Sequence, residues 1–435
     1  MGNRFVLPVF RAGEREAWGW RNIVSILSAI AKNLKTFAGR MARAHRVITA
    51  SALGLALAGC GGGMNMGDLF SDSGAPARQQ TQAPKAPPKV GGNAPRVALL
   101  LPLSAPGTMG RVARSMKKSA ELAMIDAGRP GITLVVKDTS GTPSGARMAA
   151  QAAVEEGAKL ILGPLLASSV KAARAPAASR GIPVVAFSSQ SSVAGNGVYL
   201  MSFLPEEEVD NVVRYATSAG KRNIAAMLPQ SAYGNVITRA FYAAAKRHHA
   251  AIVAEERYVR TKSGIRASAA RMAQRLAAPA SKADALFFPE SPKLLKAAGA
   301  AMTAAGFTPA RAKLLGTSLW DSAAIRTTPL AIGGWYAGVE PRLVNYFTSH
   351  FQQSYGSRPP RIASLAYDAT SLAIALGRGA FSRREIENPE GFQGMNGLFR
   401  FRSDGRIQRG LAILEVTPTG PRVAAAAPTR FAGGY

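Results

Sequence analysis

The chain has 435 residues and a single cysteine, Cys60, so it can form no internal disulfide. The residues after Cys60 are too numerous for one compact core and suit two lobes, which 47% apolar side chains can stabilise. Lys and Arg number 54 against 25 Asp and Glu, a net charge of +29. The part from Cys60 onward keeps 45 basic and 23 acidic residues, or +22, which favours anionic partners such as lipid headgroups, an acidic cell-wall polymer or an acidic protein face. A compositional bias toward Arg and Ala would explain the same excess. No zinc-finger or aromatic–basic RNA signature is present, so nucleic acid is not an expected partner.

Residues 1–59 have the features of a leader. Arg43 and Arg46 precede an apolar stretch, 47–57, that is too short to span a bilayer as a stable helix, which is typical of a signal peptide. A signal peptide of conventional length would begin at Met41, so we expect translation to start there rather than at residue 1.

The leader ends in Leu57, Ala58, Gly59 and Cys60, which resemble the lipobox of bacterial lipoproteins. The resemblance implies that the Cys60 thiol is diacylated, that the peptide is cut before it, and that the new amino terminus is acylated. Several acyl chains, at about 0.8 kcal/mol per buried CH₂, would hold the protein on a membrane permanently. Gly61, rather than Asp, at the next position favours the outer membrane, with the folded part in the periplasm. A cysteine that merely follows a leader is the alternative.

The sequence of residues 60–95 indicates a disordered tether that follows the expected lipidated cysteine. Gly, Pro, Gln, Ala and Ser dominate this segment, and large apolar side chains are almost absent. Fully extended, it would reach about 120 Å, so the folded part can work well away from the membrane.

From residue 96 short apolar runs alternate with Ala-rich helical periods. The first series predicts strands at 97–101, 132–137, 159–162 and 183–187, with helices at 111–127, 144–156 and 168–179. The second predicts strands at 223–228, 251–259, 283–288 and 312–315, with helices at 233–247, 264–276 and 292–305. Continuous apolar strands are buried on both faces, which indicates parallel sheets covered by helices.

The remaining segments predict how the chain passes between two such lobes. A crossing strand is expected at 333–340, two helices at 344–355 and 365–376 that return to the first lobe, and a hairpin at 398–416 that turns at 403–405. The predicted fold is α/β: two lobes, each a doubly wound, mostly parallel sheet flanked by helices, with several crossovers at a hinge. The expected boundaries are 96–203 plus 340–390 for lobe one, 204–339 plus 391–427 for lobe two, and 428–435 for a tail.

The candidate ligand-binding cleft lies at the carboxyl ends of the predicted strands, where doubly wound sheets bind their ligands. The polar or aromatic candidates are Ser104, Ser168, Ser169, Ser188 and Ser189 in lobe one, and Tyr233, Glu290 and Trp320 in lobe two. Hydroxyls at such turns also serve simply as helix caps, and this alternative remains open for each serine.

Several of these residues carry a family resemblance. The segments that carry it are Gly163-Pro164 followed by Ser168, 181–185 followed by Ser188, Ala232-Tyr233-Gly234 and Tyr367-Asp368-Ala369. Their order resembles type I periplasmic binding proteins of the branched-chain amino-acid receptor kind. The resemblance implies that Ser168 or Ser169 and Ser188 bind a ligand carboxylate, that Tyr233 packs over the ligand, and that Glu290 pairs with its ammonium group.

Two further segments narrow the resemblance. Residues 100–104 and 315–320, together with the lipobox, are similar to the penicillin-binding protein activator lipoproteins, and the match extends from Pro95 to about Ala426. It implies a lipid-anchored, non-catalytic module that activates a peptidoglycan synthase. The alternative is a membrane-tethered receptor of the branched-chain amino-acid transporter type, with an amino acid, small peptide or muropeptide as its ligand.

No catalytic site is expected. The histidines beyond the leader, His248, His249 and His350, are not spaced as metal ligands, and no metal or other cofactor is predicted. Three short motifs follow the order found in serine acyl enzymes: Ser-Ser-Val-Lys at 168–171, Tyr-Gly-Asn at 233–235 and Lys-Ser-Gly at 262–264. Such enzymes need the third motif on an antiparallel strand, whereas Lys262 is expected to open a helix. We therefore expect that the protein is not an enzyme.

Overall fold

The computed structural model describes residues 94–377 and 381–431, which belong to one compact unit. The expected leader, the start at Met41, the lipidated Cys60, nearly all of the tether and the end of the tail lie outside the described residues. Within the described part of the chain, no helix combines the length and the apolar character needed to cross a bilayer.

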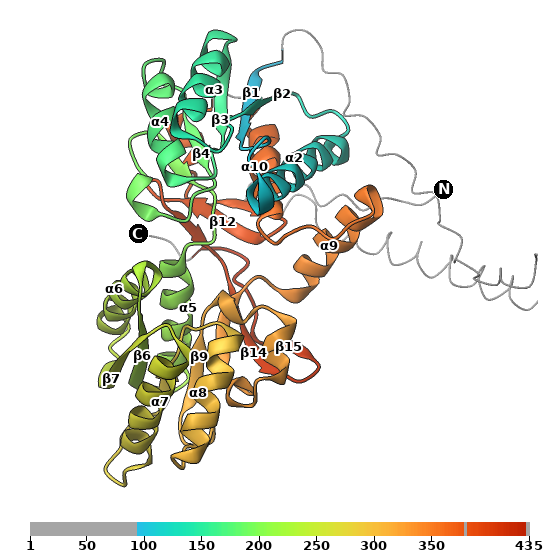
Figure 1. Cartoon of the computed structure of the whole chain (residues 1–435). Helices are drawn as coiled ribbons and strands as arrows, with labels where there is room; N and C mark the ends of the chain where they lie inside the picture. Colours follow the sequence, from blue (N-terminus) through green and yellow to red (C-terminus); the bar gives the residue numbers. More distant parts are fainter. Residues whose placement is uncertain (1–93, 378–380, 432–435) are drawn as a thin grey trace, which may run out of the picture. The chain divides into compact units, whose positions relative to one another are not determined.

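The first lobe is built on a sheet of five parallel strands in the order β2-β1-β3-β4-β5 (Figure 1). The strands are β1 (Arg96–Leu101), β2 (Thr133–Asp138), β3 (Ala158–Leu162), β4 (Val184–Ala186) and β5 (Val198–Leu200). The first four confirm the predicted strands, whereas β5 was not predicted. Residues 97–101 of β1 are all buried, as expected for a strand covered on both faces.

Helices cover this sheet on both sides. They are α2 (Gly107–Ala127), α3 (Pro143–Glu155), α4 (Ala167–Ala178), α9 (Pro341–Tyr355) and α10 (Ala363–Leu376). α2 packs beside α10 and α3 beside α4, and Figure 1 shows the two pairs on opposite sides of the strands. Phe347 and Phe351 of α9 and Leu365 of α10 belong to the apolar core of this lobe, which confirms that both helices return to it.

The second lobe contains a seven-stranded sheet in the order β15-β14-β10-β9-β8-β6-β7. Its strands are β6 (Asn223–Gln230), β7 (Ala251–Val259), β8 (Ala285–Phe287), β9 (Lys313–Gly316), β10 (Trp335–Gly338), β14 (Ala412–Thr417) and β15 (Gly420–Ala425). β6 to β10 are parallel, and β14 and β15 complete one edge in antiparallel fashion.

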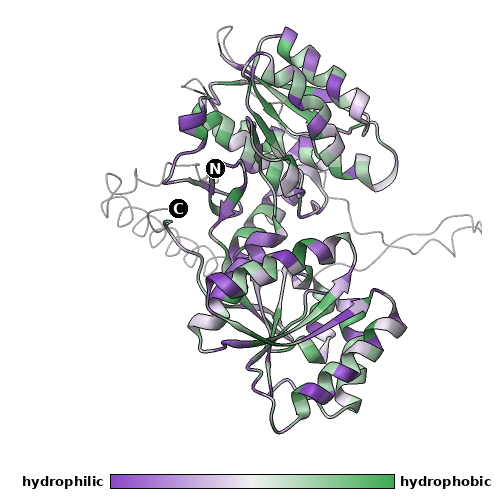
Figure 2. Cartoon of the chain, turned by 90° about the vertical axis from the view of Figure 1, so that its left-hand side faces the viewer, coloured by the Kyte–Doolittle hydropathy of each residue, from purple (hydrophilic) through white to green (hydrophobic). Residues whose placement is uncertain are grey.

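Four helices cover this second sheet. They are α5 (Pro205–Ser218), α6 (Ala232–Arg247), α7 (Lys262–Ala277) and α8 (Pro292–Ala304). α5 packs beside α6, and α7 beside α8. Figure 2 shows apolar residues concentrated in the sheets and polar residues on the outward faces of the helices. α5 was not predicted, although Pro205 and the three glutamates that follow it are typical of a helix start.

The segment 391–427, which the sequence places in lobe two, is divided between the lobes. A small antiparallel sheet forms first, from β11 (Phe392–Gly394), β12 (Gly397–Phe401) and β13 (Ile407–Arg409). Phe392, Phe399 and Phe401 of this sheet belong to the core of lobe one, whereas β14 pairs with β10 in lobe two. The predicted hairpin is therefore β12 and β13 alone, and strands this short have no apolar period that would reveal which core they join.

Three crossings join the lobes, at 201–204, 339–340 and 410–411. Arg409, just before the third crossing, binds the first, because its Nε donates to the carbonyl oxygen of Ser202 at 2.9 Å. The Arg409 guanidinium lies 5.0 Å from the ring centre of Phe203, and that of Arg361 lies 4.3 Å from the same ring. Phe203 itself packs against apolar cores of both lobes.

Arg409 faces a buried carboxylate. Its terminal nitrogen lies 3.8 Å from Asp368, which also accepts hydrogen bonds from the backbone N–H of Met395 at 2.6 Å and from the Asn396 amide at 2.7 Å. Burial raises the pKa of Asp368 and lowers that of Arg409 to about 10. Each charge is stable at this depth only because the other is present, so Asp368 serves the fold.

Replacing Arg409 by Met should therefore destabilise the protein strongly. The change keeps most of the side-chain volume but leaves Asp368 without its cation, and we expect a loss of about 3 kcal/mol in the free energy of unfolding, measured by urea denaturation at pH 7. The control is Arg422→Met, because the Arg422 side chain is 68% exposed and pairs with Glu415 at the surface. It should lose less than about 1 kcal/mol. Equal losses in the two variants would contradict the structural role of Arg409.

Candidate functional site

The carboxyl ends of β1, β3 and β4 bring the predicted serines of lobe one to one edge of the sheet. These three strands are neighbours, and they lead into Ser104, into Ser168 and Ser169 at the start of α4, and into Ser188 and Ser189. Ser104, Ser168 and Ser189 are exposed, whereas Ser169 and Ser188 are buried. The exposed hydroxyls are therefore the ones available to a ligand.

The hydroxyls of the two buried serines form hydrogen bonds with backbone groups. Ser169 donates to the carbonyl oxygen of Thr142 at 3.5 Å, and Ser188 accepts from the backbone N–H of Gln190 at 3.2 Å. Ser168 has a different status, because α4 begins without a side-chain cap and no hydrogen bond engages the Ser168 hydroxyl within the described chain. The alternative of helix capping therefore does not account for Ser168.

Asp138, at the end of β2, fixes the loop that carries Ser104. Its carboxylate accepts backbone hydrogen bonds from Leu103 at 2.9 Å, Ser104 at 3.3 Å and Ser140 at 2.8 Å. Burial alone would raise the pKa of Asp138, but these hydrogen bonds and one from the Ser104 side chain hold it below its ordinary value. Asp138 thus remains ionised and positions the loop.

Gly163 allows the two central strands to meet at this edge. Its φ is +93°, and a Cβ there would lie 2.2 Å from the carbonyl oxygen of Leu100. Only glycine fits both the backbone conformation and the close approach of β1. The glycine of Gly163-Pro164, which is part of the family resemblance, is therefore explained by the close packing of the backbone just before α4.

In lobe two the structure brings Tyr233, Glu290 and Trp320 close together. The Tyr233 hydroxyl lies 3.1 Å from Thr317, and the Trp320 indole N–H donates to the carbonyl oxygen of Glu290 at 3.1 Å. Trp320 is fully buried, and a Cβ on Gly316 would lie 2.3 Å from its ring. Gly316 is thus required by the indole, which belongs to the core of the lobe rather than to the surface that a ligand would meet.

The Glu290 carboxylate is paired with a cation of the protein itself, Arg260. This fully buried carboxylate accepts two hydrogen bonds from Arg260, at 2.7 and 2.9 Å, and others from Tyr258 at 3.1 Å and from the backbone of Ser291 at 2.6 Å. Burial would raise the pKa of Glu290, but the Arg260 and Ser291 contacts outweigh it and the pKa lies below its ordinary value. The carboxylate that the resemblance assigns to a ligand ammonium is therefore neutralised internally.

Arg260 and Glu208 were not predicted as site residues. Arg260 directly follows β7, so the rule of strand carboxyl ends would have found it. Its side chain is 37% exposed, and one of its terminal nitrogens has no partner among the described residues. Glu208 is buried, its pKa is raised by that burial, and it accepts the backbone N–H of Ser318 at 3.0 Å. On this side the accessible group is thus a guanidinium.

The motifs that resemble an acyl enzyme lie on separate elements. Lys262 begins α7, as expected, and not an antiparallel strand. Two of the three histidines considered above contact carboxylates of the protein: His248 lies 3.0 Å from Asp210, and His350 lies 2.8 Å from Asp126. Within the residues that the structure describes, no group of three or more His, Cys, Asp or Glu side chains is placed to hold a metal ion.

The Glu290 site gives a pH-dependent prediction. Glu290→Gln should lower the free energy of unfolding at pH 7 by about 1–3 kcal/mol, because the charged pair with the partly exposed Arg260 is lost. Since the folded pKa of Glu290 is below its unfolded value, the pair stabilises the protein above about pH 4.5, and this contribution disappears as the pH falls through the folded pKa.

The difference between wild type and Glu290→Gln, measured by urea denaturation, should therefore narrow from pH 7 to pH 3. The control is Glu121→Gln, because Glu121 pairs with Lys117 on the surface of α2 and should matter little at any pH. A difference that widens on acidification would refute the assignment.

Comparison with known proteins agrees with the two-lobe fold. A family model described as periplasmic binding protein matches residues 95–421. Similar solved structures include the C-domain of LpoA (YraM) from Haemophilus influenzae, a regulator of PBP1A, at 18% identity over 75% of this chain and 100% of that one, with a TM-score of 0.60.

Two further structures belong to the amino-acid binding branch. A branched-chain amino acid ABC transporter protein from Rhodospirillum rubrum is 20% identical over 76% of this chain and 99% of that one, with a TM-score of 0.65. The leucine binding protein LivK from Thermotoga maritima is 17% identical over 77% and 98%, with a TM-score of 0.53. No curated protein sequence matches the chain. The family match, which extends over most of the chain and over both lobes, establishes that this protein belongs to the periplasmic binding protein family.

Proposed function

We propose that this protein is a lipid-anchored, non-catalytic periplasmic module that activates a peptidoglycan synthase of the penicillin-binding protein class. The observation that carries the proposal is the internal pairing of Glu290 with Arg260. The resemblance assigns the Glu290 carboxylate to a ligand ammonium, but here that carboxylate is paired with Arg260, and the accessible charged group is the guanidinium. The fold similarity to a regulator of PBP1A supports the same conclusion.

The surface of lobe two supports an acidic partner. α7 and α8, which pack side by side, contain no Asp or Glu. Of their exposed cations, Arg271 and Arg275 pair with Glu256 of β7, and four others remain: Lys262, Arg266, Lys293 and Lys296. None of these four takes part in an ion pair within the described chain. A face with this charge attracts an acidic protein surface, and the attraction should weaken with salt because exposed charges are screened beyond about 8 Å at physiological ionic strength.

The direct test is reconstitution of the mature protein with the penicillin-binding proteins of its own cell. We expect the rate of glycan polymerisation or crosslinking to rise several-fold, and the stimulation to fall as salt increases. The double variant Lys293→Glu, Lys296→Glu should weaken stimulation. The double variant Lys171→Glu, Arg174→Glu on α4 of lobe one changes the net charge equally, is the matched control, and should not weaken it. If the protein stimulates none of the synthases, the proposal is refuted. If it stimulates one equally at low and high salt, the electrostatic part of the proposal is wrong.

The alternative is a tethered receptor for an amino acid or small peptide. The exposed Ser168 hydroxyl at the uncapped start of α4 favours it, because hydroxyls and backbone N–H groups at such a position suit a carboxylate. Calorimetry with amino acids and muropeptides separates the two functions. Micromolar binding that is abolished by Ser168→Ala and by Arg260→Gln would favour the receptor.

The anchor is a separate part of the proposal and rests on Cys60 at the end of the leader. Cells grown with labelled palmitate should incorporate lipid into the wild-type protein but not into Cys60→Ala, and the wild type should fractionate with the outer membrane. Label in the Cys60→Ala protein would show that the anchor has been assigned wrongly.

A further inference from the structure

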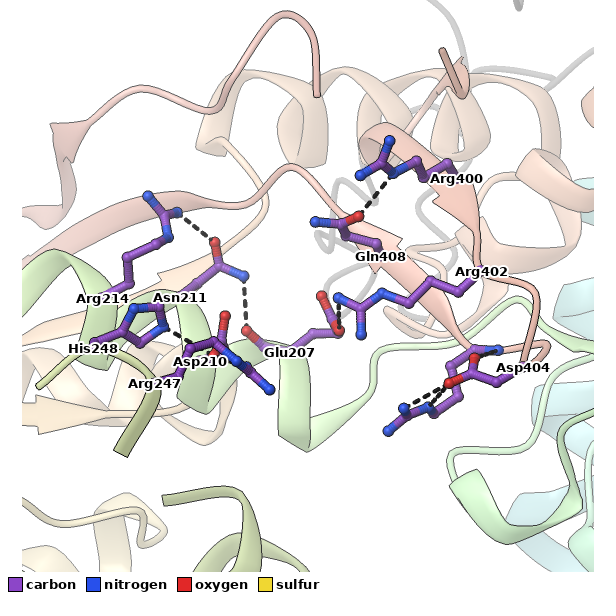
Figure 3. A network of polar contacts seen from close by, with 11 residues as sticks. Glu207, Asp210, Asn211, Arg214, Arg247, His248, Arg400, Arg402, Asp404 and Gln408 are labelled. Carbon is purple, nitrogen blue, oxygen red and sulfur yellow. Dashed lines mark hydrogen bonds and ion pairs between the residues drawn. The ribbon is translucent and has the colours of Figure 1, made fainter. Parts of the chain in front are cut away.

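A cavity lies on the flank of α5 and α6, apart from the candidate cleft residues. Its volume is about 290 Å³, and none of the eight predicted cleft residues lines it. Its walls come from α5, α6, the short helical turn Ser191–Val193 and the turn between β12 and β13. Figure 3 shows polar side chains of α5, α6 and the β12–β13 hairpin that line this cavity or lie beside it, among them Glu207, Asp210, Arg247 and Arg402.

Charged side chains of both signs line the cavity. The acidic ones are Glu206, Glu207 and Asp210, and the basic ones are Arg239, Arg247, Arg402 and Arg406. The mixture distinguishes this cavity from the basic surface of α7 and α8. Its carboxylates do not converge as metal ligands, since the described residues contain no cluster fit for a metal ion. A ligand that suits the cavity must therefore carry both charges itself.

Most of these charges are already paired with one another. Arg402 lies 3.0 Å from Glu207, Arg247 pairs with Asp210, and Arg406 lies 2.6 Å from Asp404 (Figure 3). These closed pairs shape the walls and leave little capacity to bind anything else.

Two groups remain open. Glu206 receives one hydrogen bond, from the Ser191 hydroxyl to Oε1 at 2.7 Å, while its Oε2 is buried without a partner. A buried carboxylate oxygen in this state is unfavourable unless something binds it. Arg239, on α6, is exposed and has no partner within the described residues. The cavity is thus lined by one acceptor, Oε2 of Glu206, and one cation, Arg239, that have no partner within the described residues.

We propose that this cavity binds a small zwitterion, a free amino acid or the end of a short peptide. Its ammonium group pairs with Oε2 of Glu206, and its carboxylate pairs with Arg239, whose planar guanidinium suits a carboxylate. The site is distinct from the cleft and from the synthase contact proposed above. Because Ser191 belongs to lobe one and α5 and α6 to lobe two, the ligand would also strengthen a contact between the lobes.

The test uses L-alanine as the probe, with ethylamine and propionate as fragments that each retain one of its charged groups. Calorimetry on the full mature protein should show saturable binding of L-alanine at millimolar or lower concentration, and each fragment should bind at least tenfold more weakly. Glu206→Gln and Arg239→Gln should each weaken L-alanine binding at least tenfold. Arg174→Gln, an exposed arginine of α4 outside this cavity, is the matched control and should leave binding unchanged.

The outcomes separate this site from the cleft. Binding that is lost in Ser168→Ala or Arg260→Gln but kept in the two cavity variants would overturn the proposal and place the ligand in the cleft. The absence of saturable heat with L-alanine would overturn it as well. Arg239 is exposed, so Arg239→Gln should fold even if Glu206→Gln does not, and unchanged thermal unfolding without ligand checks this. Synthase stimulation is measured separately, and its loss or retention does not bear on this site.

Discussion

The buried guanidinium of Arg409 is the constraint on which the arrangement of the chain depends. A buried arginine needs compensation, and here it comes from segments far apart in the sequence: the Ser202 carbonyl, the Phe203 ring and the Asp368 carboxylate, which lies 3.8 Å from a terminal nitrogen that makes no hydrogen bond. Ser202 and Phe203 belong to the first crossing between the lobes, and Arg409 itself precedes the third. The charge can be satisfied only when these crossings lie together, so folding of the junction and pairing of the charge are one event.

The same junction extends toward the cleft. Phe203 lies between the guanidinium groups of Arg409 and Arg361, and Arg361 approaches Asp321 of lobe two at 3.8 Å. The positive charge of Arg361 also favours the ionised form of the buried Glu208, which holds the backbone of Ser318 beside Trp320. The loop at the end of β9 is thus positioned by charges that begin at the junction. A substitution of Arg409 should consequently alter the position of this loop at the candidate cleft as well as the stability of the whole protein.

The positions of most helices and strands could be predicted because apolar runs and Ala-rich helical periods alternate clearly along the chain. The carboxyl-end rule likewise placed Ser104, Ser168 and Ser188 on one edge of lobe one. What could not be predicted depends on contacts between distant residues. Glu290 is separated from Arg260 by a complete helix, so its neutralisation leaves no local pattern. The short strands β11 to β13 join the core of lobe one only because their phenylalanines fit there.

The location of the basic helices bears on how the proposed activation of a synthase could work. α7 and α8 belong entirely to lobe two, and they form their own apolar core with the sheet beneath them. A partner that binds only this face makes the same contacts in every relative position of the two lobes. Its binding therefore cannot favour one lobe arrangement over another. Coupling between a ligand and the synthase therefore requires the synthase to touch lobe one as well, or to contact the elements around Glu206 and Arg239, where the lobes meet. In the absence of such a contact, the proposed activation would use the two-lobe fold only as a support for a charged surface.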